Sequence, residues 1–64
     1  MSRYNIQFTA ECDADRTARS LAHEYGTVIA TNPDLCLAIV DVPDEDDANF
    51  QALMNGDDSV IEYW

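Results

Sequence analysis

Apolar and polar residues alternate at the start of the chain. Every second residue from Tyr4 to Ala10 is apolar, and the residues between them are Asn5, Gln7 and Thr9. This period of two predicts a β-strand that has one side on a core and the other toward water or a partner.

Two further strands are predicted on either side of a turn. Residues 27–31 are rich in β-branched side chains, and Asn32-Pro33-Asp34 favours a tight turn after them. Residues 35–40 are continuously apolar, which is typical of an inner strand. We expect alternate residues of this strand to face the helices, namely Leu35, Leu37 and Ile39. The other row would then lie on the open side of the sheet, namely Cys36, Ala38 and Val40. A last strand is predicted at residues 60–64.

A helix is predicted after the first strand. Its apolar residues recur at helical spacing, namely Ala14, Ala18, Leu21, Ala22 and Tyr25. Asp13 or Asp15 can act as the N-cap, and Gly26 suits a left-handed exit. The small alanines indicate that the helix packs closely on a sheet.

A second helix is predicted to begin at Asp44 and to end at Asn55-Gly56. Pro43 suits the residue before a helix, and Asp44 with Asp47 three residues later has the spacing of an N-cap and its reciprocal partner. Acidic residues in a first turn also face the positive end of the helix dipole. We expect the helix to bury three apolar residues, namely Phe50, Leu53 and Met54.

The predicted order of elements is β-α-β-β-α-β. Its usual closed form is the ferredoxin-like α+β fold, a four-stranded antiparallel sheet with both helices on one face. Right-handed crossovers place the first and third strands inside the sheet. Residues 1–64 form one domain, because a chain this short is close to the lower limit for burying a core without a metal, disulfides or a partner.

The charge of the chain is large and unevenly distributed. The formal net charge is −10, and the sequence contains no lysine. Residues 1–23 carry three arginines and three acids, whereas residues 24–64 carry ten acids and no lysine or arginine. Such a surface repels nucleic acids and anionic membranes, attracts basic grooves and slows self-association. We therefore expect a monomer or a weak dimer.

The sequence has little of the chemistry that catalysis needs. His23 is the only histidine, and no serine has a histidine and an acid near it in sequence. A calcium loop starting at Asp44 fails because its sixth position is Asn49 and its twelfth is Asn55. No zinc spacing and no phosphate-binding loop is present. We predict a protein that is not an enzyme and that uses no cofactor or metal.

The cysteines and the apolar segments indicate the compartment. Cys12 and Cys36 are not a C-x-x-C pair, and no apolar run approaches the ~20 residues that span a membrane. The start of the chain does not have the pattern of a secretion signal. We predict a cytoplasmic protein with two reduced, partly buried thiols, although a disulfide between them is possible.

The acidic runs and the small size resemble the phage proteins that mimic DNA, including anti-CRISPR proteins. The resemblance implies a stoichiometric inhibitor, active in the host cytoplasm if phage-encoded, that occupies the basic DNA-binding groove of a nucleic-acid-binding machine such as a CRISPR-Cas surveillance complex. A groove built for one negative charge per ~1.7 Å of duplex accepts a rigid scaffold that presents acids at comparable density. The predicted contact residues are Asp34, Asp41, Asp44, Glu45, Asp46, Asp47, Asp57, Asp58 and Glu62.

Two alternatives stay open. Tyr4-Asn5-Ile6-Gln7-Phe8 resembles the first strand of the propeptides of subtilisin-type proteases, and Ser59-Val60-Ile61-Glu62-Tyr63 resembles their closing strand. This resemblance implies a protease inhibitor that uses its C-terminal residues. Apart from the resemblance, an aromatic residue in a last strand suits either a contact or a plug of the core, so both roles stay open for Trp64. An acidic surface is also typical of halophilic proteins, so the chain could be an acidic binding domain adapted to salt.

Overall fold

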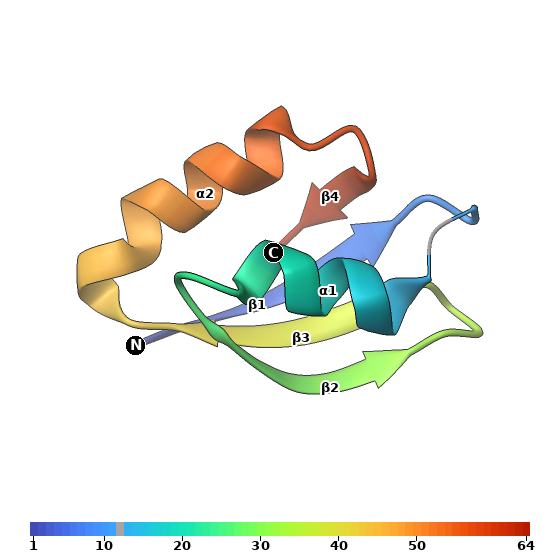
Figure 1. Cartoon of the computed structure of the whole chain (residues 1–64), viewed down its shortest axis with the longest axis horizontal. Helices are drawn as coiled ribbons and strands as arrows, with labels where there is room; N and C mark the ends of the chain where they lie inside the picture. Colours follow the sequence, from blue (N-terminus) through green and yellow to red (C-terminus); the bar gives the residue numbers. More distant parts are fainter. Residues whose placement is uncertain (12) are drawn as a thin grey trace.

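The computed structural model describes residues 1–11 and 13–64. Its elements follow the predicted order, with a short 3-10 turn before the second helix (Figure 1). In chain order they are β1 (Ser2–Phe8), α1 (Ala14–Ala22), β2 (Thr27–Asn32), β3 (Leu37–Val42), η1 (Asp44–Asp46), α2 (Asp47–Gly56) and β4 (Val60–Tyr63).

The four strands form one antiparallel sheet in the order β2-β3-β1-β4. The inner strands are β1 and β3, as the crossover rule requires. One face of the sheet contributes Ile6 and Phe8 to the core, and both helices pack on that face through residues such as Ala18 and Phe50. The ferredoxin-like α+β fold predicted from the sequence is therefore confirmed.

Helix α1 lies close to the sheet because its inner residues are small. Ala14 and Ala18 are completely buried, and Ala22 nearly so. Asp13 is the N-cap, and its carboxylate accepts a hydrogen bond of 3.2 Å from the backbone N–H of Arg16. The predicted helix and the first of its two candidate caps are confirmed.

Gly26 has a different role from the predicted left-handed exit, because its φ is not positive. A Cβ atom at this position would lie 2.9 Å from the carbonyl oxygen of Asp41 and 2.9 Å from Cγ1 of Val40. Glycine is required here because the chain leaving α1 passes directly against β3, and only a residue without a side chain leaves room.

The predicted facing of β3 is wrong. The strand begins at Leu37, and the core receives Ala38, Val40 and Val42, all of them buried. Leu35 lies in the preceding turn with 58% of its surface exposed. The pairing with β1 decides the facing: Ile6 points to the core, and Ala38 lies directly opposite it.

The turn before β3 explains why the strand starts later than predicted. Cys36 has a φ of 54°, in the left-handed region, so extended structure cannot run through it. The thiol of Cys36 is free and half-buried. The expectation for Cys12, and hence for a pair of thiols or a disulfide, lies outside the described residues.

The start of the second helix also differs from the prediction. A 3-10 turn precedes α2, and in the described part of the chain neither Pro43 nor Asp46 caps a helix start with its side chain. The predicted N-cap role of Asp44 is wrong, because its carboxylate faces the N-terminal amino group instead. The predicted end at Gly56 is confirmed.

Helix α2 buries two of its three predicted core residues. Phe50 and Met54 are buried, whereas Leu53 is 42% exposed and the prediction for it is wrong. The helix contacts the sheet along a narrow stripe, and Leu53 lies beside that stripe, facing the space between the helices. None of the helices in the described ranges is long and apolar enough to cross a bilayer.

Candidate binding surfaces

Four of the nine predicted contact acids bind partners within the protein. The carboxylate of Asp41 accepts two hydrogen bonds from the Arg3 guanidinium, 2.7 Å from Nε and 3.0 Å from Nη2. The side chain of Asp41 is only 15% exposed. The hydrogen bonds from Arg3 hold the pKa of the Asp41 carboxyl below its usual value. Asp41 is thus neutralised by a bidentate pair on the sheet.

Asp47 belongs to a closed cluster of three side chains between β1 and α2. Its carboxylate accepts hydrogen bonds from the Tyr4 hydroxyl and, at 3.0 Å, from Nε2 of Gln51. Gln51 Nε2 also donates to the Tyr4 hydroxyl oxygen at 2.9 Å. Partial burial, and next the hydrogen bond to Asp47, raise the pKa of Tyr4. Asp47 therefore fastens α2 to the sheet.

Asp44 and Asp57 each have one partner. Oδ1 of Asp44 lies 2.6 Å from the amino group of Met1, and both groups are largely exposed. Oδ1 of Asp57 accepts a hydrogen bond of 2.8 Å from the backbone N–H of Ser59, which closes the turn before β4. These two acids keep one oxygen each for a partner.

The carboxylates of the other five predicted acids have no hydrogen bond or ion pair with any described residue. They lie in η1, in β4 and in two turns, and they are Asp34, Glu45, Asp46, Asp58 and Glu62. The η1 turn and the β2–β3 turn that holds Asp34 lie at opposite ends of the molecule's long axis (Figure 1), which measures 31 Å. The nine acids therefore do not form one continuous track.

The acids gather instead at the two ends of α2. Glu45 and Asp46 precede the helix, and Asp57 and Asp58 follow it (Figure 1). Ten residues at a rise of ~1.5 Å separate the two groups by about 15 Å. The exposed residues between them are uncharged, namely Ala48, Asn49, Ala52, Leu53, Asn55 and Gly56. The helix thus presents two anionic groups with a neutral surface between them.

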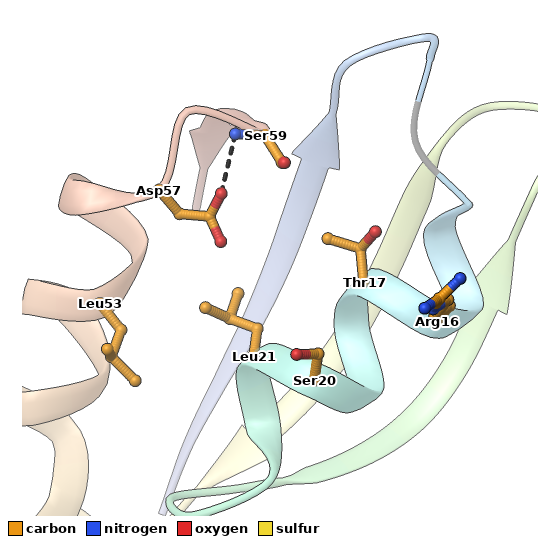
Figure 2. Close-up of a pocket in the computed structure, with 7 residues that line it drawn as sticks. All are labelled: Arg16, Thr17, Ser20, Leu21, Leu53, Asp57 and Ser59. Carbon is orange, nitrogen blue, oxygen red and sulfur yellow. Dashed lines mark hydrogen bonds between the residues drawn. The ribbon is translucent and has the colours of Figure 1, made fainter.

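The arginines weaken this acidic surface little. Arg3 is bound by Asp41, and Nε of Arg19 lies 3.0 Å from the carboxylate of Asp15. Arg16 is the one arginine without an ion pair to another described residue, and it lies on the outer side of α1 (Figure 2).

A groove of about 450 Å³ separates the two helices. Figure 2 shows Leu21 of α1 and Leu53 of α2 pointing toward one another across it. Asp57 and Ser59 close one end, joined by their hydrogen bond, and Arg16 lies at the far end. The groove is mixed in polarity and carries charges of both signs, so it does not select one kind of ligand.

The open face of the sheet carries large apolar residues that the sequence reasoning placed elsewhere. Because Ile6 and Phe8 face the helices, Asn5 and Gln7 face away from them. Ile39 lies opposite Asn5, and Leu37 lies opposite Gln7, so both apolar side chains are on the open face. The apolar run at residues 35–40, which predicts the third strand, could not reveal this, because both of its alternate rows are apolar. Asp41, which continues the row of Leu37 and Ile39 just beyond that run, was the local signal for the outward facing.

Trp64 lies on the same open face. Its backbone N–H and C=O form two hydrogen bonds with Asn5, of 3.0 and 2.9 Å, which place the two residues directly opposite each other. Its side chain is 59% exposed. Trp64 therefore lies at the surface, and of the two roles expected for it the core plug is excluded.

The described residues contain no group of three or more histidine, cysteine, aspartate or glutamate side chains placed to hold a metal ion. Comparisons of the chain with protein families, with curated proteins and with solved structures found no match. The functional argument therefore depends on the surfaces described above.

Proposed function

We propose that the protein is a non-enzymatic inhibitor that acts as a DNA mimic. In this proposal its free carboxylates occupy the basic DNA-binding groove of a nucleic-acid-binding machine, such as a CRISPR-Cas surveillance complex, and so exclude the target DNA. The observation that carries the proposal is the pair of anionic groups at the two ends of α2, on a surface with no lysine or arginine after residue 19.

The spacing of the two groups is compatible with this role. They are about 15 Å apart along the helix, comparable with the ~12 Å width of the major groove of B-DNA. Phosphates on the two sides of a groove also form two anionic rows with an uncharged gap between them. Glu45 and Asp46 would replace phosphates of one row, and Asp58 those of the other.

The proposal is tested by charge reversal at the free acids. We expect Glu45→Lys, Asp46→Lys and Asp58→Lys together to abolish inhibition of target DNA binding by purified CRISPR-Cas complexes, measured by competition with labelled duplex. Asp47 is left unchanged, since reversing it would disrupt its hydrogen bonds to Tyr4 and Gln51.

The matched control is Glu11→Lys, Glu24→Lys and Asp34→Lys, at three acids whose carboxylates have no hydrogen bond or ion pair with any described residue. Both triple variants change the net charge equally, so only the position of the charges differs. Affinity of the unmodified protein should fall steeply with added salt. The proposal would be contradicted if the affinity did not depend on salt concentration, or if the control variant lost as much inhibition as the α2 variant.

The alternative of halophilic adaptation predicts a different result in the same salt series. If the acids serve only to hold water and salt, the domain should unfold at low salt through repulsion between its carboxylates. Circular dichroism at each salt concentration separates this loss of structure from a loss of binding.

An inhibitor of the subtilisin-propeptide type is a second candidate, and the exposed end of β4 favours it. Ile61 is 62% exposed and Trp64 59% exposed, so both are available to a protease. This candidate predicts that Trp64→Ala abolishes inhibition of subtilisin while the three charge reversals on α2 have little effect. Tyr63 is not suitable for this test, because its ring packs against Tyr4 and its hydroxyl donates a hydrogen bond to Oδ1 of Asn55.

A further inference from the structure

The open face of the sheet has an apolar centre. Across its middle row lie Ala30 of β2, Ile39 of β3, Asn5 of β1 and Trp64, in that order. Leu37 lies two residues from Ile39 on the same strand, and a hollow of about 350 Å³ is lined by Ala30, Leu37 and Ile39. Three of the four strands or strand ends in this row therefore present an apolar side chain.

The fold itself does not require this arrangement. The open face of an antiparallel sheet is commonly polar, because it faces water. In β3 the small Ala38 faces the helices, and the larger Leu37 and Ile39 face outward. Ala30 and the half-buried Leu37 and Ile39 line one hollow, and Asn5 separates them from the exposed Trp64. Grouped apolar residues of this kind mark an interaction site more often than isolated ones do.

The charges of this face determine which partner it suits. Arg3 is neutralised by Asp41, so it offers no free positive charge. Glu62 stands beside Gln7 on the open face, and Asp34 lies in the turn at the end of β2; neither has an ion pair with a described residue. The free charges around the apolar centre are thus negative.

A second copy of the chain would be a poor occupant. Two copies packed face to face would bring together two net charges of −10 and would place like charges around a small apolar contact. A cationic partner has the opposite effect, because each lysine or arginine at the edge meets a free carboxylate.

We propose that the open face of the sheet is a second docking surface, which binds a basic amphipathic helix of another protein. The apolar side of that helix would cover Leu37, Ile39 and Trp64, and its basic residues would meet Glu62 and Asp34. Leu37 and Ile39 are about 7 Å apart along the strand, and Ile39 and Trp64 about 10 Å apart across it, distances that an i, i+4, i+7 row of apolar residues can span. The surface lies on the layer opposite α2, so it is independent of the proposed DNA mimicry.

The single tryptophan of the chain reports directly on this surface. The probe is a synthetic helical peptide of Leu and Lys with one apolar side, compared with a Lys and Ser peptide of equal charge. We expect the Leu/Lys peptide to shift Trp64 emission to shorter wavelength and to bind about tenfold more tightly than the Lys/Ser peptide, because only the former buries apolar surface.

Two matched alanine substitutions locate the site. Ala30→Lys places a positive charge in the hollow, and Ala52→Lys places the same charge on the exposed side of α2. We expect Ala30→Lys to remove the preference for the Leu/Lys peptide and Ala52→Lys to preserve it, with both variants folded by circular dichroism. If Ala30→Lys does not fold, a second pair replaces the first: Ile39→Gln should remove the preference for the Leu/Lys peptide, and Leu53→Gln should preserve it.

Three results would overturn the proposal. The first is equal binding of the two peptides, which would show that charge alone acts. The second is equal loss of binding in the two members of a matched pair. The third is a dimer in sedimentation experiments that Ile39→Gln dissociates, which would show that a second copy covers the face. The charge reversals on α2 should leave the tryptophan shift in place, so this test and the test of DNA mimicry can fail separately.

Discussion

The same substitution, glycine to alanine, should have opposite effects at the two glycines of this chain. At Gly26 the added methyl group would lie 2.9 Å from the carbonyl oxygen of Asp41 and 2.9 Å from Cγ1 of Val40. The carbonyl belongs to the backbone of an inner strand and cannot turn away. At Gly56, the last residue of α2, a methyl group meets nothing within 4 Å.

The magnitudes follow from overpacking at one site and chain entropy at the other. Forcing a methyl group into a filled space costs about 1–3 kcal/mol, so Gly26→Ala should lower the free energy of unfolding by about 1–2 kcal/mol after the entropic gain is included. Gly56→Ala should raise it by about 0.5–1 kcal/mol, because alanine loses less freedom in a helix than glycine does. The total free energy of unfolding of a domain of this size is only about 3–10 kcal/mol, so both changes are measurable.

Thermal unfolding followed by circular dichroism is the assay, with urea unfolding as a check on the free energies. In a domain this small, 1 kcal/mol corresponds to roughly 4–8 °C in Tm. We expect the Tm of Gly26→Ala to fall by about that amount or more and the Tm of Gly56→Ala to rise. If Gly26→Ala matched or exceeded the parent protein in stability, the close approach of the chain to β3 would be refuted as the reason for this glycine.

Three further predictions concern the core and the polar clusters. Arg3 lowers the pKa of Asp41, so the stability that this pair contributes is present above about pH 4 and is lost as the pH falls through the lowered pKa. Asp41→Asn should therefore make the free energy of urea unfolding less sensitive to acid between about pH 5 and about pH 2. Tyr4→Phe should lower the free energy of unfolding by about 1 kcal/mol through loss of its hydrogen bond to Asp47. Because the pKa of Tyr4 is raised, this contribution should be present below about pH 10 and lost as the pH rises through the raised pKa, which an alkaline titration of the unfolding curve checks. Ala38→Leu should destabilise by about 1–3 kcal/mol in the same urea assay, since this residue faces the core; a neutral effect would contradict the facing of β3.

The candidate surfaces could be predicted only in part. The density of acids in residues 41–47 is a property of the sequence, but their availability is not. Asp41 and Asp47 bind Arg3 and Tyr4, residues that are 38 and 43 positions away along the chain. No local pattern indicates such partners, so the free acids could be separated from the paired ones only in three dimensions.

The sequence by itself determined the order of helices and strands and the end of α2 at Gly56, and it narrowed the cap of α1 to Asp13 or Asp15. These features depend on side chains within a few residues of one another, so the spacing of apolar residues and the residue types at turns predict them directly. The tertiary structure decided which side of β3 meets the helices, because residues 35–40 are all apolar and alternation along this run does not distinguish the two sides. Pairing with β1 then set the facing, and it placed Leu37 and Ile39 on the outer surface.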